Sequence, residues 1–146
     1  MAEPDTAEAA APVLGARGEL TLVLDGSPMG LRPSYEAIEA IEAATGRGLI
    51  DLARDALGGR LSLGATAQIA TECIRAWGRE HENGSASGAN AKRVAKLILD
   101  SDEGFHGTLQ TLSAMLSLAV TGGYDSSGEL RPSTKTTTTG GASVGG

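Results

Sequence analysis

The chain has 146 residues and a formal net charge of −6, and aromatic residues make up only 3% of it. This length suits one domain, and the acidic balance argues against nucleic-acid binding, which needs a positive stripe to neutralise phosphates. The single cysteine, Cys73, excludes an internal disulfide and is typical of a reducing compartment. There is no signal-peptide pattern and no apolar run near the ~20 residues that span a bilayer. We therefore expect a soluble cytoplasmic protein without membrane contact.

Both ends of the sequence are poor in large apolar side chains. Residues 1–16 are rich in Ala, Glu and Pro, and residues 122–146 are mostly Gly, Ser and Thr. Neither stretch buries enough apolar surface to offset the entropy of ordering its backbone. The composition therefore predicts a disordered N-terminal extension over residues 1–16, one domain over residues 17–121, and a disordered tail over residues 122–146.

The first ordered element is predicted to be a β-hairpin. Leu20, Leu22 and Leu24 alternate at the period of a strand, which places them on one face. Residues 25–28 have the composition of a turn, and a short return strand is expected over residues 29–32. Two strands alone are marginal in water, so this hairpin needs a helix or a second chain against it.

Four or five short helices are predicted after the hairpin. Ser34 is the expected N-cap of the first helix, and Gly46 is its expected end. Apolar periodicity predicts helices over residues 34–45, 49–57, 64–81, 90–99 and 107–121. The intervening stretches that we expect to form loops are residues 82–88 and 100–104.

Two of these helices have well-defined buried stripes in the sequence. In the first helix the expected buried residues are Tyr35, Ile38, Ile41 and Thr45. In the third helix they are Thr66, Ile69, Ala70, Cys73 and Trp77. The predicted fold class is therefore mainly α (α+β), with an N-terminal β-hairpin followed by packed helices.

No set of residues supports catalysis or metal binding. His81 and His106 lack partners at the spacing of a triad or a metal site, and Cys73 lies about two helical turns from His81, roughly 12 Å away. The acidic residues 100–104 lack the ligand pattern of an EF-hand, and the nucleophile-elbow pattern at residues 141–145 falls in a Gly/Thr tail. We expect no enzymatic activity, no catalytic residue, no cofactor and no metal, and a buried, inert Cys73.

Three residues are candidates for partner contact. Trp77 is the last residue of the apolar stripe on the third predicted helix. Packing in the core is the favoured interpretation, and an interface anchor is the alternative. Thr21 and Val23 alternate with the leucines of the predicted hairpin, whose edge could pair with another chain. A basic trio on one helix is most simply a solvated face, with an acidic partner as the alternative (Lys92, Arg93 and Lys96).

The stretch from Gly18 to about Ala56 carries motifs in a recognisable order. It contains Glu-Leu-Thr-Leu-Val-Leu-Asp-Gly at 19–26, Leu-Arg-Pro-Ser-Tyr-Glu-Ala-Ile at 31–38, and Thr-Gly-Arg-Gly-Leu at 45–49. In this order and spacing the chain resembles the small tail-assembly protein of gene transfer agents and related phages, a family labelled both a tail tube protein and a tail assembly chaperone. The resemblance covers about residues 17–121 and is strongest in the first third. Both ends are longer than in the compact family member.

The resemblance implies a chaperone role in the cytoplasm of a bacterial host. Such proteins coat the tape-measure protein before the tail tube polymerises around it, which implies the tape-measure protein as a partner. The tail tube protein and self-association are further options. Two alternatives stay open: a minor structural, tube-associated tail subunit, and a small helical regulatory protein. The family offers no catalytic residue to carry over, and the C-terminal tail is where a longer, frameshifted product would diverge.

Overall fold

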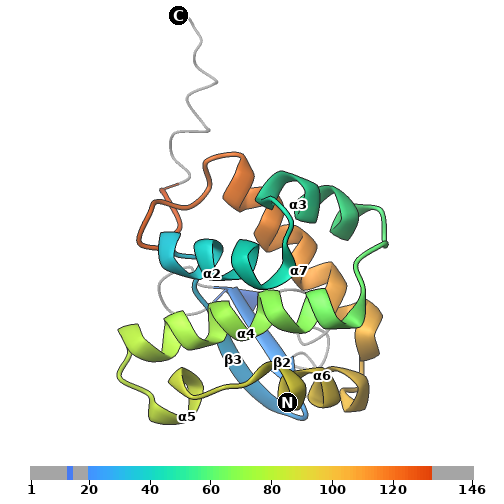
Figure 1. Ribbon diagram of the computed structural model, residues 1–146. Coiled ribbons are helices and arrows are strands. Elements are labelled where there is room, and N and C mark those ends of the chain that lie inside the picture. The colour runs from blue at the N-terminus through green and yellow to red at the C-terminus, as the bar shows by residue number, and fades with distance from the viewer. Residues whose placement is uncertain (1–12, 15–19, 133–146) are drawn as a thin grey trace, which may run out of the picture.

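The computed structural model describes residues 13–14 and 20–132 (Figure 1). Its strands are β1 (Val13–Leu14), β2 (Leu20–Leu24) and β3 (Ser27–Leu31). Its helices are α2 (Tyr35–Thr45), α3 (Leu49–Leu57), α4 (Leu63–Glu80), α5 (Gly84–Ser87), α6 (Ala91–Asp100) and α7 (Gly104–Val120). The predicted mainly α (α+β) fold, with an N-terminal hairpin ahead of packed helices, is confirmed. No helix of the described residues is long and apolar enough to cross a membrane.

The β2–β3 hairpin closes through a two-residue turn. Asp25 and Gly26 both have positive φ, at 52° and 76°, which is the backbone that favoured hairpin turns require. Ser27 and Pro28 were predicted to belong to the turn, but they lie in β3. Pro28 pairs with Val23, one position beyond the hydrogen-bonded pair Leu24–Ser27 that flanks the turn. At this position a backbone N–H would point away from β2, so a proline, which has none, costs no hydrogen bond between the two strands.

A third strand, β1, extends the sheet and makes β2 its central strand. Val13 pairs with Thr21 and Leu14 pairs with Leu20, both antiparallel. The predicted disorder of residues 1–16 is therefore wrong at Val13 and Leu14, because these residues meet the outer edge of β2. Residues 1–12, 15 and 16 lie outside the described residues.

Helix α2 begins and ends as predicted, but one residue of its predicted buried stripe is exposed. The Ala37 amide donates to Ser34 Oγ at 3.2 Å, and Gly46 ends the helix with φ 72°. Ala37 and Ile41 are buried, whereas Tyr35 is 59% exposed, so the predicted buried stripe is wrong at Tyr35. Tyr35 opens the helix on its solvent side, where its hydroxyl donates to Glu39 Oε2 at 3.4 Å.

Helix α4 is the central element of the domain. It contacts α2, α5, α6, α7 and β3, and Figure 1 shows it crossing the middle of the molecule with the hairpin behind it. Its predicted stripe is confirmed at Thr66, Ile69, Ala70 and Cys73, whereas Trp77 is half-buried. Burial of Cys73 raises the pKa of its thiol well above the usual range, with a smaller contribution from the Glu72 carboxylate. A thiol in this state is a poor nucleophile.

Two helix boundaries differ from the prediction. The expected loop over residues 82–88 contains the short helix α5, because the Asn83 side chain accepts a hydrogen bond from the Ala86 amide at 2.9 Å and caps it. Helix α7 begins at Gly104 rather than at residue 107. The described residues therefore contain six helices instead of four or five.

Residues 122–131, here called the C-terminal clasp, fold back onto the domain. Tyr124 forms a bridge with Leu130 and is only 7% exposed. The Asp125 carboxylate accepts hydrogen bonds from the Ser127 hydroxyl and from the Ser127 and Glu129 amides, which lowers its pKa. The predicted disorder from residue 122 onward is therefore wrong over the clasp, because Tyr124 supplies a buried anchor. Residues 133–146 lie outside the described residues.

The clasp docks around Arg32, at the base of the hairpin. Arg32 is 5% exposed, and its Nη2 lies 3.8 Å from Glu80 Oε1 and 3.7 Å from Glu129 Oε2. The Tyr35 amide, at the start of α2, donates to the Ser126 carbonyl at 2.8 Å. Clasp, hairpin base and the end of α4 thus meet around one buried guanidinium.

A candidate partner-binding groove

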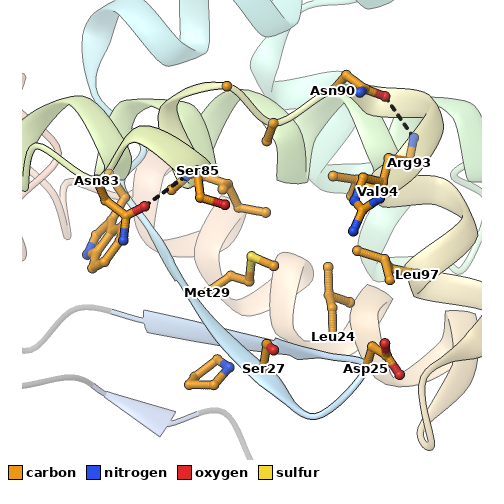
Figure 2. Close-up of a pocket in the computed structure, with 16 residues that line it drawn as sticks. Leu24, Asp25, Ser27, Met29, Asn83, Ser85, Asn90, Arg93, Val94 and Leu97 are labelled. Carbon is orange, nitrogen blue, oxygen red and sulfur yellow. Dashed lines mark hydrogen bonds between the residues drawn. The ribbon is translucent and has the colours of Figure 1, made fainter.

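A groove of about 540 Å³ lies between the tip of the β2–β3 hairpin and helices α4, α5 and α6 (Figure 2). We call it the hairpin-tip groove. Figure 2 shows Met29 pointing from the hairpin toward Ser85 on α5, and Leu24 lying beside Leu97 of α6, with Val94 of α6 above them. The groove therefore forms where the hairpin tip projects below α5 and the loops that join it to α4 and α6.

The apolar lining has two layers. Leu24, Ile74 and Val94 form a buried floor, with no more than 3% of any of them exposed. Above this floor, Met29 and Trp77 are half-buried and come from two different elements, β3 and α4. Half-buried Leu97 completes the set from α6. Because these three side chains are partly exposed, an occupant could cover further apolar surface on all of them.

The position of Trp77 depends on a glycine in β3. The indole lies over Gly30, where an added Cβ would stand 2.3 Å from Trp77 Nε1. The ring also contacts the imidazole of His81 in a tilted arrangement, at 4.5 Å between centroids and an interplanar angle of 34°. The single Trp of the chain is thus held at the wall of the groove by a small residue and an aromatic neighbour.

The polar residues of the rim are fixed by the helix starts. Asn83 caps α5, and the Asn90 side chain accepts from the Arg93 amide at 2.9 Å to cap α6. The connection between these helices is tied to α4, because Arg75 Nε donates to the Ala89 carbonyl at 2.7 Å. These contacts preorganise the rim, which lowers the entropy cost of binding.

Charge is distributed unevenly around the groove. Asp25 lines it on the hairpin side and Arg93 on the α6 side. Lys92 and Lys96 flank Arg93, and all three cations of α6 are exposed. The α6 side therefore favours an acidic group on an occupant.

The groove is suited to binding rather than to chemistry. The described residues that line it include no Cys, His or Glu, and the charged ones among them are Asp25 and Arg93. Among the described residues, no cluster of three or more His, Cys, Asp or Glu side chains could hold a metal ion. An apolar trough with a preformed polar rim is the form of site that accepts one face of an amphipathic helix.

The structure separates the three residues that the sequence proposed for partner contact. Trp77 lines the groove, but Thr21 and Val23 do not. Thr21 pairs with Val13 of β1, while Val23 is 44% exposed on β2. Sequence reasoning missed Met29 and Leu97 as groove residues, because their spacing is the same as that of fully buried neighbours.

A second cavity, of about 370 Å³, lies beside the C-terminal clasp. Its lining includes Arg32, Arg79, Glu80 and serines of the clasp. Arg32 already makes ion pairs with Glu80 and Glu129, so this cavity presents a compensated polar network. It offers little apolar surface to a partner, and the hairpin-tip groove is the better candidate.

Comparison with known families agrees with the resemblance found in the sequence. A family model described as phage tail tube protein, GTA-gp10, matches residues 17–122. No curated protein and no solved structure matches the chain. The matched family is one of phage tail proteins and is not an enzyme family. The chain belongs to this family.

Proposed function

We propose that this family member is a tail assembly chaperone that binds apolar helical segments of the tape-measure protein during tail morphogenesis. The observation that carries the proposal is the hairpin-tip groove, with its three half-buried anchors Met29, Trp77 and Leu97. A tape-measure protein is a long helical client that must be kept from aggregating in the host cytoplasm. A groove that covers one apolar helix face at a time meets that need.

The groove also suits release. It is small, at about 540 Å³, so each contact buries only a few side chains of the client. Many weak contacts along one client hold it firmly together, yet each exchanges rapidly for an incoming tube subunit.

The second candidate is a structural, tube-associated subunit, which the family description favours. The sheet argues against a tube wall built by strand addition. Its β3 edge carries Pro28, which has no N–H to donate, and the Arg32 amide just beyond β3 already donates to the Cys73 carbonyl at 3.0 Å. A strand of another subunit therefore has few backbone partners along this edge.

Co-expression with the tape-measure protein and pull-down tests the proposal. The double variant Met29→Ser/Leu97→Ser should lower recovery of the client at least about tenfold, since truncating two interface anchors costs more than about 1.4 kcal/mol. Leu57→Ser is the matched control, because Leu57 is 68% exposed on α3 and lies outside the groove. Unchanged recovery with the double variant would refute the groove as the client site.

Val23→Ser tests whether the exposed face of β2 makes a further contact, with Thr21 as its neighbour on that face. Mass spectrometry of purified particles separates the two candidate functions. A chaperone should be absent from the finished particle, whereas a tube-associated subunit should be present in many copies.

A further inference from the structure

The direction of β1 carries an inference about residues 1–12. Because β1 runs antiparallel to β2, with Val13 opposite Thr21, the N-terminal end of β1 points along β2 toward Leu24. Leu24 is at the hairpin tip and lines the hairpin-tip groove. The N-terminal end of β1 therefore points toward the side of the molecule that carries the groove.

Residues 1–12 are long enough to enter it. The distance along β2 from Thr21 to Leu24 is about 10 Å at ~3.3 Å per residue. An extended chain of this length spans up to about 40 Å, which leaves roughly 30 Å beyond the hairpin tip. Reaching α6 across the groove therefore needs no change in the described fold.

The charge of the segment complements the α6 side of the groove. Residues 1–12 carry the carboxylates of Glu3, Asp5 and Glu8 and contain no Lys or Arg. The α6 side presents the exposed cations Arg93 and Lys96, with Lys92 beside them. Within the described part of the chain, none of these three cations lies in an ion pair with a carboxylate.

The composition of the segment also suits a weak occupant. Asp5 and Thr6 are good N-cap residues, residues 7–11 are four alanines and a glutamate, and Pro12 follows them. Alanines can cover Met29, Trp77 and Leu97 but bury far less apolar area than Leu or Phe. Such a segment binds in cis through its high local concentration, in the millimolar range for a short tether, and yields to a client with larger side chains.

We propose that residues 1–12 of this chain occupy the hairpin-tip groove when no client is bound, and so act as a built-in competitor. The segment lies before residue 17, where the match to the family begins. Its role as a competitor rests on the proposed function, whereas its place in the groove does not.

Disulfide trapping in the full chain tests the occupancy. The pair Ala9→Cys/Leu97→Cys should form an intramolecular disulfide about tenfold faster than the control pair Ala9→Cys/Leu57→Cys, since only the first pair gains the local concentration of a bound segment. The native Cys73 is fully buried and does not compete. Equal rates for the two pairs would overturn the proposal, as would disulfides that form only between two molecules.

Charge reversal gives a second readout without added thiols. Glu3→Lys/Asp5→Lys/Glu8→Lys should increase acrylamide quenching of Trp77, the only Trp, because the segment leaves the groove. The control reverses three exposed carboxylates outside the groove lining (Glu36→Lys/Asp51→Lys/Asp102→Lys) and should leave quenching unchanged. The same increase in both variants would count against the proposal.

Client binding separates failure of this inference from failure of the proposed function. The trapped Ala9–Leu97 variant should lose client binding that returns on reduction. If the trapped form binds as well as the reduced one, the competitor role is wrong. If the unsubstituted chain does not bind the client either while trapping remains specific, the proposed function fails and the occupancy stands.

Discussion

The two ends of the β2–β3 hairpin differ in how their side chains are covered. At the base, Arg32 is buried beneath the C-terminal clasp, and the amide that opens α2 is bonded to a carbonyl of the clasp. At the tip, Met29 and Trp77 remain half-buried beside a groove of about 540 Å³. The base is covered through polar contacts with the C-terminal clasp, whereas the tip leaves apolar surface that an occupant of the hairpin-tip groove can cover.

The base of the hairpin is therefore expected to contribute mainly to stability, and the tip mainly to binding. The base joins three segments that are distant in sequence, namely the end of β3, the end of α4 and the clasp. The tip brings together side chains whose further burial would be favourable but does not occur among the described residues. Substitutions at the base should therefore act on folding, and substitutions at the tip should act on binding and on the local environment of Trp77.

The largest effect is expected from Arg32→Ala. It removes a buried stem and the cation shared by Glu80 and Glu129, which should lower the free energy of unfolding by about 2–4 kcal/mol. Both carboxylates are about half exposed and can be solvated by water after the loss of Arg32. We therefore expect the loss in the free energy of unfolding not to exceed about 4 kcal/mol. Chemical denaturation measures the change. Arg79→Ala, an exposed control at the same end of α4, should cost less than about 0.5 kcal/mol.

Gly128→Ala should be the next most damaging change. Gly128 has φ +87°, and a Cβ there would lie 2.8 Å from Arg32 Cγ and 2.9 Å from the Ser34 amide nitrogen. We expect a loss of about 2–3 kcal/mol with faster hydrogen exchange at the Tyr35 amide, because the clasp lifts. Gly26→Ala shares the positive φ but meets no atom within 4 Å, so it should cost only about 1 kcal/mol. Equal losses would mean that the clasp is not tightly docked.

A smaller effect is expected at the tip from Gly30→Ala. The new methyl group collides with the indole of Trp77, so the side chain must move and stability should fall by about 1–2 kcal/mol. Since Trp77 is the only Trp, its fluorescence emission should shift and report the displacement directly. Gly84→Ala on α5 is the control, because a Cβ there meets nothing within 4 Å. Unshifted emission in Gly30→Ala would show that the Trp77 wall is placed wrongly.

The smallest change, and of opposite sign, is expected from Tyr124→Phe in the clasp. The Tyr124 hydroxyl is buried and has no hydrogen-bond partner among the described residues, and burial is the main reason that its pKa is raised. Removing a buried polar group without a partner should leave stability unchanged or raise it by up to about 1 kcal/mol. Denaturation beside Tyr35→Phe, where the hydroxyl is exposed, measures this. A loss above about 1 kcal/mol would reveal a partner for the hydroxyl.

The parts of the fold that local patterns encode were predicted well. The alternating leucines of β2, the Ser34 cap and the Gly46 end all lie where the sequence places them, since each depends on a few neighbouring residues. The clasp could not be predicted in this way. Its composition is that of a loop, and besides the anchor Tyr124 it is held by Arg32, which lies far from it in the sequence and pairs with Glu129.

The groove was only partly predictable for a related reason. Trp77 stood out by its residue type, and an interface role was the alternative to core packing. Met29 and Leu97 have the periodicity of core residues, and what leaves them half-buried is the gap between hairpin tip and α6. That gap depends on how far the hairpin projects, which periodicity does not encode.

Pro28 has a consequence for how many copies can work side by side. A chaperone that coats a long client brings its own copies to high local density. Unpaired strand edges would then pair between copies and form fibres. On β3 the proline ring interrupts the row of donors, and the Arg32 amide is committed to α4. Under the proposed chaperone function, neighbouring copies on one client would therefore not pair through their β3 edges, and each copy could dissociate separately.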